Sequence, residues 1–324
     1  MNAKEFVRDL LLDMLRIKSF SQREFHLVCY ISELLDKWEI EHRLQWLGDC
    51  SCNLIINPVK EPELVLLTHL DTVKRKTQTK AHGDIIFGLG ASDPKGQLTT
   101  LLLIIYDLAT NSTLPSDVSF AFVANEEIDG VGSFLYLNEY RPKLGIVFEP
   151  TSLNVCHGCV GSLGLSVKFN AEECHGSLTT NSDALSTFTK IYNELKNLFD
   201  VRVIYLQIGT GNVYTVPGSG QAVIDLSVDC WRSALDKVKT LLKKYNVEWT
   251  CSSLADSWIV TGTFVDRFYS TVKKLRNTSK LVFYPSWTDA TRFIERGIPA
   301  IIFGAGDLYY AHTNREYINV NDII

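Results

Sequence analysis

The sequence lacks any hydrophobic run long enough to cross a membrane. Its longest apolar stretches, such as LVLLTHL and PAIIFG, fall far short of the ~20 residues that a transmembrane helix needs. The first residues, MNAKEFVRDLLLDML, mix acids with apolar residues and contain no small-residue cleavage site. They predict an amphipathic first helix rather than a signal peptide. We therefore expect a cytoplasmic protein without a membrane partner.

Basic blocks and repeats are missing as well. The 32 Lys and Arg residues are scattered among 37 Asp and Glu residues, and the net charge is −5. No interleaving of basic and aromatic residues indicates a nucleic-acid partner. No internal repeat or low-complexity linker is present either. These absences predict a soluble globular protein without a nucleic-acid partner.

The eight cysteines lack the pairing that a structural zinc site needs. Cys156 and Cys159 form CHGC and Cys50 and Cys52 form C-x-C, but the remaining cysteines provide no second pair at the spacing of CHGC. A redox role for CHGC is an alternative, although no thioredoxin-like βαβ pattern surrounds it. Without a secretory signal, we expect reduced thiols.

What the sequence does contain is an alternation of helical and strand patterns. Apolar residues recur at helical spacing from Phe25 to Trp38, whereas ELVLLTH, DVSFAFVAN and LGIVFE are short continuous apolar runs. Such runs alternating with helices predict an α/β domain with a mainly parallel sheet covered on both faces. Residues 159–262 instead follow a β-α-β-β-α-β order, which indicates an inserted α+β domain of ferredoxin-like type. The α/β domain then consists of residues 1–158 and 263–324.

Polar residues follow several predicted strands where these strands end. His69 ends one strand, Glu126 and Glu127 follow VSFAFVAN, Glu149 ends LGIVFE, and His312 lies in the loop after AIIFG. In open α/β sheets, ligands bind beyond the carboxyl ends of the strands. We therefore expect these side chains to meet at one edge of the sheet.

A sixth residue, Asp93, comes from the glycine-rich loop GLGASDPKG just before a predicted helix. Two imidazoles and several carboxylates suit a pair of zinc-like ions, and an aspartate is able to bridge them. Each residue alone has an ordinary explanation, such as a hydrogen-bonded His, a solvated Glu-Glu turn or a turn around SDPKG. The coincidence of all five segments in order favours the metal site.

The segments THLDTV, GLGASDPKGQL, ANEEIDGVGS, FEPT and YAHTNREYI resemble the motifs of the zinc aminoacylase and carboxypeptidase family. That family includes acetylornithine deacetylase, N-acetyl-lysine deacetylase and succinyl-diaminopimelate desuccinylase. SWTDATRFIERGIPAIIFG resembles the family's last catalytic segment, so the resemblance spans nearly the whole chain. It implies a homodimer with two Zn²⁺ per subunit, for which Co²⁺ can substitute, and an inserted lid or dimerisation domain.

The resemblance also implies a role for each residue at the strand ends. His69 and Glu149 would bind one metal ion, and Glu127 and His312 would bind the other. Asp93 would bridge the two ions.

Three further residues would take part in catalysis by the same resemblance. Asp71 would orient the His69 ring. Glu126 would act as general base on a water and carry the proton to the leaving amine. His175, in NAEECHGSL, would stabilise the oxyanion, often in the partner subunit's site; the alternative is an exposed His at a strand end.

The sequence departs from the family at Ser227, where relatives usually place an Arg that grips a substrate carboxylate. Arg232 and Arg292 lie elsewhere in the chain, and Arg292 is our candidate for binding the substrate's α-carboxylate. The missing Arg favours a neutral acetyl group over an acyl group that ends in a carboxylate, such as succinyl. The resemblance further implies a cis peptide bond between Asp93 and Pro94.

We predict a metal-dependent amidohydrolase that removes a small acyl group, above all acetyl, from an amino acid such as acetylornithine or acetyl-lysine. A metallo-carboxypeptidase or dipeptidase acting at the same di-zinc site is the near alternative. A non-catalytic binding member of the family is a second alternative, against which the presence of Glu126 and the full ligand set argues.

Overall fold

The computed structural model describes residues 3–111, 113–178, 180, 182–209, 211, 213–245 and 247–324. The chain forms two compact units: the first contains residues 1–158, 260–284 and 288–324, and the second contains residues 159–259 and 285–287. None of the helices in the described part of the chain combines the length and apolar character needed to cross a membrane.

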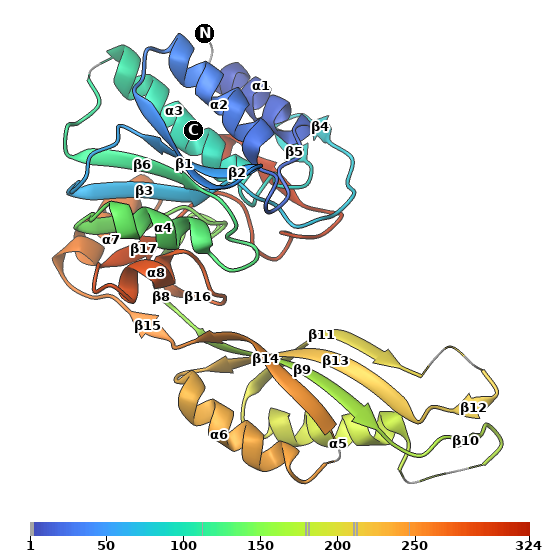
Figure 1. Ribbon diagram of the computed structural model, residues 1–324. Helices are drawn as coiled ribbons and strands as arrows, with labels where there is room; N and C mark the ends of the chain where they lie inside the picture. Colours follow the sequence, from blue (N-terminus) through green and yellow to red (C-terminus); the bar gives the residue numbers. More distant parts are fainter. Residues whose placement is uncertain are drawn as a thin grey trace. The chain divides into compact units, whose positions relative to one another are not determined.

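A mixed β-sheet forms the centre of the first unit (Figure 1). Its four central strands run parallel in the order β6-β3-β7-β17, while β1, β2 and β8 join at the flanks as antiparallel strands. The predicted mainly parallel α/β sheet is therefore confirmed in its centre. The strands are β1 (His42–Gly48), β2 (Ser51–Ile56), β3 (Leu64–His69), β6 (Val118–Val123), β7 (Leu144–Val147), β8 (Val155–Cys159), β16 (Leu281–Tyr284) and β17 (Ala300–Ile302).

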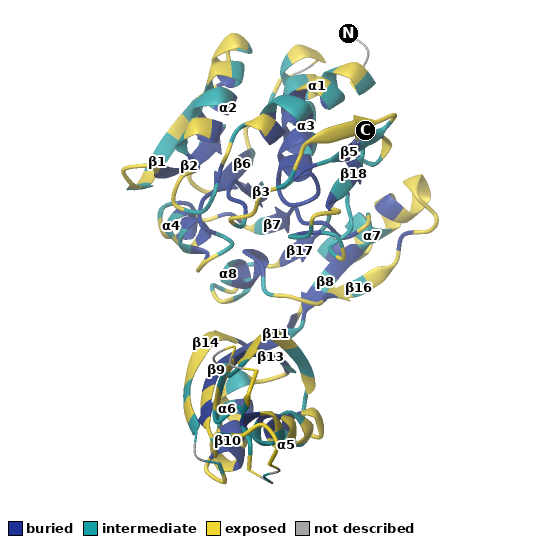
Figure 2. Ribbon diagram, turned by 90° about the vertical axis from the view of Figure 1, so that its right-hand side faces the viewer, coloured by how far each residue is buried: buried dark blue, intermediate teal, exposed yellow. Residues whose placement is uncertain are grey.

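Helices cover both faces of this sheet, which explains why its strands read as continuous apolar runs. Figure 2 shows the central strands as buried along most of their length. Helices α1, α2, α3 and α7 pack on one face, and α4 and α8 contact β6, β7 and β17 from the other side. The helices are α1 (Ala3–Arg16), α2 (Phe25–Lys37), α3 (Lys95–Asn111), α4 (Val131–Glu139), α7 (Thr263–Leu275) and α8 (Ala290–Ile294).

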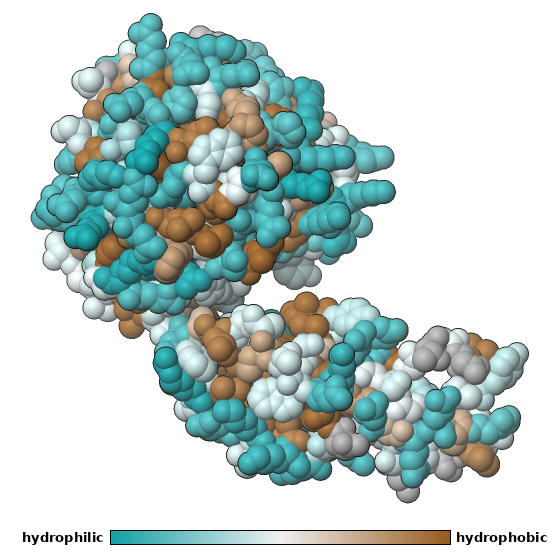
Figure 3. Space-filling model, viewed as in Figure 1, coloured by the Kyte–Doolittle hydropathy of each residue, from teal (hydrophilic) through white to brown (hydrophobic). Residues whose placement is uncertain are grey.

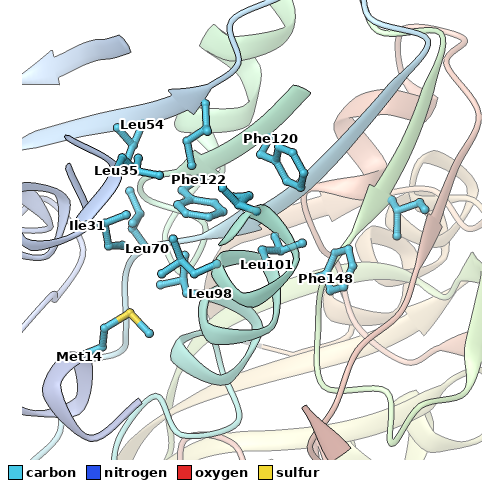
Figure 4. Close-up of a cluster of buried hydrophobic side chains, with 14 of the residues drawn as sticks. Met14, Ile31, Leu35, Leu54, Leu70, Leu98, Leu101, Phe120, Phe122 and Phe148 are labelled. Atoms are coloured by element: carbon cyan, nitrogen blue, oxygen red, sulfur yellow. The ribbon is translucent and has the colours of Figure 1, made fainter. Parts of the chain in front are cut away.

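The main hydrophobic core lies between the sheet and helices α1 to α3. Met14, Leu35 and Leu98 extend from the three helices toward Leu54 of β2 and Phe122 of β6, as Figure 4 shows. All five side chains are fully buried. Burial of each side chain of this kind contributes about 1.5–3 kcal/mol, so this core fixes the sheet on which the polar edge is built.

A small antiparallel sheet in the first unit has the strand order β18-β5-β4. It brings the segment after residue 312 next to the loop that precedes Asp93. Its elements, with the final short helix, are β4 (Lys80–His82), β5 (Ile85–Phe87), β18 (Tyr317–Asn319) and the 3₁₀ helix η1 (Val320–Asp322).

The second unit is a four-stranded antiparallel sheet of order β11-β13-β9-β14 with helices α5 and α6 packed on one face. The chain order β9-α5-β11-β13-α6-β14 is the predicted β-α-β-β-α-β order. A short pair, β10 with β12, extends from it. The elements are β9 (Gly161–Asn170), β10 (Cys174–His175), α5 (Ala184–Lys196), β11 (Asp200–Ile208), β12 (Thr215–Val216), β13 (Ser219–Val228), α6 (Trp231–Leu242), β14 (Val247–Ala255) and β15 (Trp258–Ile259).

The sequence of the second unit explains this arrangement. Along β13, Ala222, Ile224 and Leu226 are buried while the residues between them are not, which gives the sheet one apolar face for the helices. Helix α5 begins after Asp183, whose carboxylate accepts a hydrogen bond from the backbone N–H of Ser186 at 2.9 Å. Such an N-cap satisfies a backbone donor at the start of the helix.

Candidate metal centre

The parallel strands of the first unit deliver polar residues to one edge of the sheet. His69 is the last residue of β3, Glu126 and Glu127 follow β6, and Glu149 follows β7. His312 lies in the loop after β17, with a left-handed backbone at a φ of 62°. Left-handed non-glycine residues are uncommon and cluster at functional sites.

The side chains form two clusters that share Asp93. One cluster is His69, Asp93 and Glu149, the other is Asp93, Glu127 and His312, and within each the candidate ligand atoms lie within 4.8 Å of one another. His69 Nε2 is 2.8 Å from Asp93 Oδ1, and His312 Nε2 is 3.6 Å from Asp93 Oδ2. Asp93 thus presents one carboxylate oxygen to each cluster. His312 Nε2 also lies 2.7 Å from Glu127 Oε1.

Asp93 is held by a buried carboxylate that sequence reasoning missed. The backbone N–H groups of Ser92 and Asp93 donate hydrogen bonds to Glu316 Oε1 at 3.0 and 3.1 Å. Glu316 follows His312 by four residues, so it ties the loop of one candidate ligand to the loop of another. The segment YAHTNREYI contained this residue, but nothing in the pattern assigned it a role. The peptide bond between Asp93 and Pro94 is cis, which confirms the prediction.

Asp71 is fully buried and fixes the turn after β6. Its carboxylate accepts hydrogen bonds from the backbone N–H groups of Glu126 and Glu127 at 3.0 and 3.1 Å, and from the Ser21 hydroxyl at 2.7 Å. His69 Nδ1 is 3.4 Å from Asp71 Oδ1, longer than a strong hydrogen bond. The structure therefore adds a backbone-holding role to the orienting role that the resemblance implies.

Asn125, directly before Glu126, provides a second support for this turn. It has a left-handed backbone at a φ of 62°, and its side-chain oxygen accepts a hydrogen bond from the Gln22 N–H at 2.8 Å. The Asn125 N–H donates to Glu24 Oε1 at 3.3 Å. The loop between α1 and α2 thus holds the strand end that carries the candidate base.

The site concentrates negative charge away from water. Burial raises the pKa of both Glu126 and Glu149 well above the usual range, and neighbouring carboxylates add to the effect. Burial also raises the pKa of Glu127. Burial lowers the pKa of His312, but the hydrogen bond and charge of Glu127, together with the charges of Asp93 and Glu316, outweigh this effect and bring the pKa to about 9. Like charges buried together need a compensating cation.

The donor set fits divalent metal ions. Glu149 Oε1 is buried without a hydrogen-bond partner among the described residues. Imidazole nitrogens and carboxylate oxygens are ordinary zinc ligands, and a bound ion supplies the positive charge that the buried carboxylates lack.

Two further residues lie near this edge in different environments. Asp289 is buried, accepts a short hydrogen bond from the Ser133 hydroxyl, and has its pKa raised by burial to about 6. No pattern in the sequence assigned a role to Asp289. Arg292, the candidate for substrate binding, donates hydrogen bonds to the Asp129 carbonyl at 2.8 Å and to Glu295 at 3.0 Å. The Arg292 guanidinium is therefore already hydrogen-bonded to other residues of the protein.

The remaining candidate residues belong to the second unit. His175 is exposed on β10, with Nδ1 2.8 Å from the Ser177 hydroxyl. The Ser227 hydroxyl accepts a hydrogen bond from Arg202 Nη1 at 2.9 Å, so a guanidinium from the adjacent strand does lie at this position. Arg202 is paired with Asp225, however, which neutralises its charge locally.

The arrangement of CHGC argues against the redox alternative. Cys156 and Cys159 lie three residues apart on β8, so their side chains point to opposite faces of the strand. Burial raises the pKa of Cys156 to about 12, which keeps the thiol protonated. The Cys159 thiol donates to the Ser286 carbonyl at 2.6 Å.

Residues 65–324 match the family model described as peptidase family M20/M25/M40. A protein of Pyrobaculum aerophilum with the provisional name LysW-lysine/LysW-ornithine hydrolase is 25% identical over 328 residues, covering 98% of this chain and 93% of that protein. The LysW-lysine/LysW-ornithine hydrolase of Sulfurisphaera tokodaii is 25% identical over 273 residues, covering 81% of this chain and 77% of that protein.

Solved structures share the fold at low sequence identity. A tripeptidase of Staphylococcus aureus superposes with a TM-score of 0.77 at 14% identity, covering 99% of this chain and 94% of that chain. A dinuclear metal-binding peptidase of the M20 family from Bacillus subtilis superposes with a TM-score of 0.65 at 14% identity, covering 99% and 94% of the two chains.

Proposed function

Because the chain belongs to peptidase family M20/M25/M40, a family of metallohydrolases, we propose that it hydrolyses the amide of an N-acyl amino acid and releases lysine or ornithine. The resemblance to zinc aminoacylase motifs is confirmed at the level of the family. The observation that carries the proposal is the pair of clusters sharing Asp93, with Glu126 directly before the candidate ligand Glu127. The names of the two archaeal relatives support lysine or ornithine as the product, and acetyl is the simplest acyl group.

We propose that the two clusters hold two Zn²⁺ ions, which Co²⁺ can replace. His69 and Glu149 would bind one ion, Glu127 and His312 the other, and Asp93 would bind both. The imidazole and carboxylate donors support this choice of metal, as does the dinuclear neighbour from Bacillus subtilis. When bound, such ions polarise a substrate carbonyl and lower the pKa of an attacking water.

Glu126 would move the proton. Its carboxylate would take a proton from the attacking water and deliver it to the leaving amine, the usual task of a general base. The position of Glu126 favours this role. Its backbone N–H donates a hydrogen bond to buried Asp71 at 3.0 Å, so the turn that presents the Glu126 carboxylate is fixed. Asp71 would thereby position both the base and the adjacent ligand Glu127.

The second unit would serve as a lid and dimerisation domain. Its edge strand β11 exposes apolar and aromatic side chains, with Ile204 64% and Tyr205 46% exposed. An exposed apolar edge strand is readily covered by a second copy of the same chain. In such a homodimer, His175 would stabilise the oxyanion of the partner's reaction.

Metal content and amine release test the proposal together. We expect two zinc ions per chain and release of the free amino acid from N-acetyl-lysine and N-acetyl-ornithine. We expect slower release from N-succinyl-diaminopimelate, because Ser227 is itself uncharged and the neighbouring Arg202 is already paired with Asp225. A protein that holds two metal ions but releases no amine from any acylated amino acid would contradict the proposal.

Peptidase activity is the second candidate, and the likeness to a tripeptidase with a TM-score of 0.77 favours it. The same metals and Glu126 would cleave a peptide bond. Comparing kcat/KM for N-acetyl-lysine with that for a lysine-ending dipeptide separates the two. A higher value for the dipeptide would assign the protein to the peptidases.

A further inference from the structure

A basic groove lies on the first unit beside the segment that carries His312. It encloses about 780 Å³, and the cations that line it are Lys76, Lys80 and Arg315. No Asp or Glu is among the described residues that line it. All three cations are exposed, and none of them forms an ion pair in the described part of the chain.

This concentration of positive charge runs against the composition of the chain. Residues 74–80, KRKTQTK, contain four cations and no acid, whereas the whole chain carries a net charge of −5. Figure 3 shows hydrophilic side chains projecting from the part of the first unit where Figure 1 labels β4. The sequence did not reveal the groove, because Arg315 joins the two lysines only through the β18-β5-β4 sheet.

Hydrogen bonds hold the walls of the groove in place. The Arg75 guanidinium donates to Asn314 Oδ1 at 2.9 Å and to the His312 carbonyl at 2.8 Å. On the other side, the Leu89 N–H donates to the Thr77 hydroxyl at 2.9 Å. The basic loop is therefore fastened to the loop of a candidate metal ligand and to the strand region before Asp93.

Aromatic rings form the apolar part of the groove. Tyr317 lies between Phe87 and Tyr310, with ring centroids 5.7 and 5.0 Å away, and the Arg315 guanidinium is 5.7 Å from the centre of the Tyr310 ring. Rings exclude water and lower the local dielectric, which strengthens the attraction between the neighbouring cations and an anion. They also offer a surface to aliphatic side-chain stems.

The cations stand on three segments: Lys76 in a loop, Lys80 at the start of β4, and Arg315 before β18. A ligand that carries several carboxylates can pair with more than one of these cations. From this geometry we infer that the groove binds the acyl side of the substrate when that acyl group is a peptide carrying several carboxylates. The inference rests on the proposed function for the bond that is cleaved. The groove lies close to His312, because Asn314, which lines the groove, follows His312 by two residues.

The groove also supplies what Ser227 lacks. The expected preference for acetyl rested on the missing arginine of the second unit. Cations of the first unit provide another partner for acyl carboxylates, so an acidic peptide can be accepted although the arginine of the second unit is missing.

Peptide binding to a variant without the general base tests the inference apart from turnover. In a Glu126→Gln background, a fluorescent Glu-Glu-Glu-Lys peptide should bind at least about tenfold more tightly than Gln-Gln-Gln-Lys, by anisotropy, and the difference should shrink as salt rises. Adding Lys76→Glu, Lys80→Glu and Arg315→Glu should remove this tenfold difference.

A matched control separates the groove from net charge. The triple variant Lys237→Glu, Lys243→Glu and Lys274→Glu changes three exposed lysines elsewhere by the same charge and should keep the preference for the acidic peptide. Equal binding of both peptides, an equal loss in the control, or tighter binding of a single-stranded oligonucleotide would overturn the inference. Groove-dependent peptide binding by a wild-type protein that releases no lysine would support the groove and overturn the proposed function instead.

Discussion

Two candidate catalytic groups, one in each unit, are held in opposite ways. Glu126 follows a buried parallel strand, and its N–H is bound to the fully buried Asp71. His175 is exposed on the two-residue strand β10, and its ring contacts only Ser177 among the hydrogen bonds of the described residues. The first unit thus contains a preformed arrangement, whereas His175 gains an environment only when another surface meets it.

Metal removal should break the first arrangement completely and have the largest effect. Without cations, the carboxylates of Asp93, Glu127 and Glu149 repel one another, and no Lewis acid remains. Dialysis against a chelator should abolish lysine release from N-acetyl-lysine, and zinc or cobalt should restore it. Full turnover by a protein shown to be metal-free would refute this account of the first unit.

Loss of the base should come next. Glu126→Gln keeps the size of the side chain and the backbone bond to Asp71 but cannot take a proton, so turnover should fall about 10²–10⁴-fold. Metal content, measured by emission spectroscopy, should stay the same. The control Glu33→Gln changes an exposed glutamate of α2 and should leave turnover intact. A near wild-type rate in Glu126→Gln would show that another group is the base.

The variant His175→Ala tests the candidate catalytic group of the second unit. Loss of one oxyanion donor should lower turnover about 10²–10³-fold, while an exposed histidine elsewhere, changed by His82→Ala, should have no effect. Mixing His175→Ala with Glu126→Gln subunits should recover activity if the His acts on the partner's site. Confirmed mixed dimers without recovered activity would rule out action across the interface.

The smallest effect is expected from a residue that supports Asp93. Glu316→Gln weakens the two charge-assisted hydrogen bonds from the Ser92 and Asp93 N–H groups. Loss of such supporting partners typically lowers metal affinity about 10–100-fold, which a Co²⁺ titration followed by absorbance can measure. The exposed control Glu173→Gln should bind Co²⁺ normally. Unchanged affinity in Glu316→Gln would assign it a purely structural role.

The strand-end residues could be predicted from the sequence because parallel strands place their carboxyl ends at one edge. His69 and Glu149 each end or follow a continuous apolar run, so their positions followed from the sheet alone. The β-α-β-β-α-β order of the second unit was equally visible in the pattern. Both signals are local, and the fold merely brings them together.

The supporting residues could not be predicted, since their roles depend on contacts between distant loops. Glu316 accepts hydrogen bonds from a loop more than two hundred residues earlier, and Asp289 meets Ser133 of α4. Periodicity carries no information about such pairs. The backbone-holding role of Asp71 was missed for the same reason, because its N–H partners lie 55 residues and more further along the chain, after β6.

Anomalous diffraction at the zinc edge from crystals of the zinc-loaded Glu126→Gln variant tests the central claim most directly. The account predicts two peaks about 3.5–4 Å apart, one bound by His69 and Glu149, the other by Glu127 and His312, with Asp93 bound to both. A single peak, or peaks bound by other residues, would contradict it.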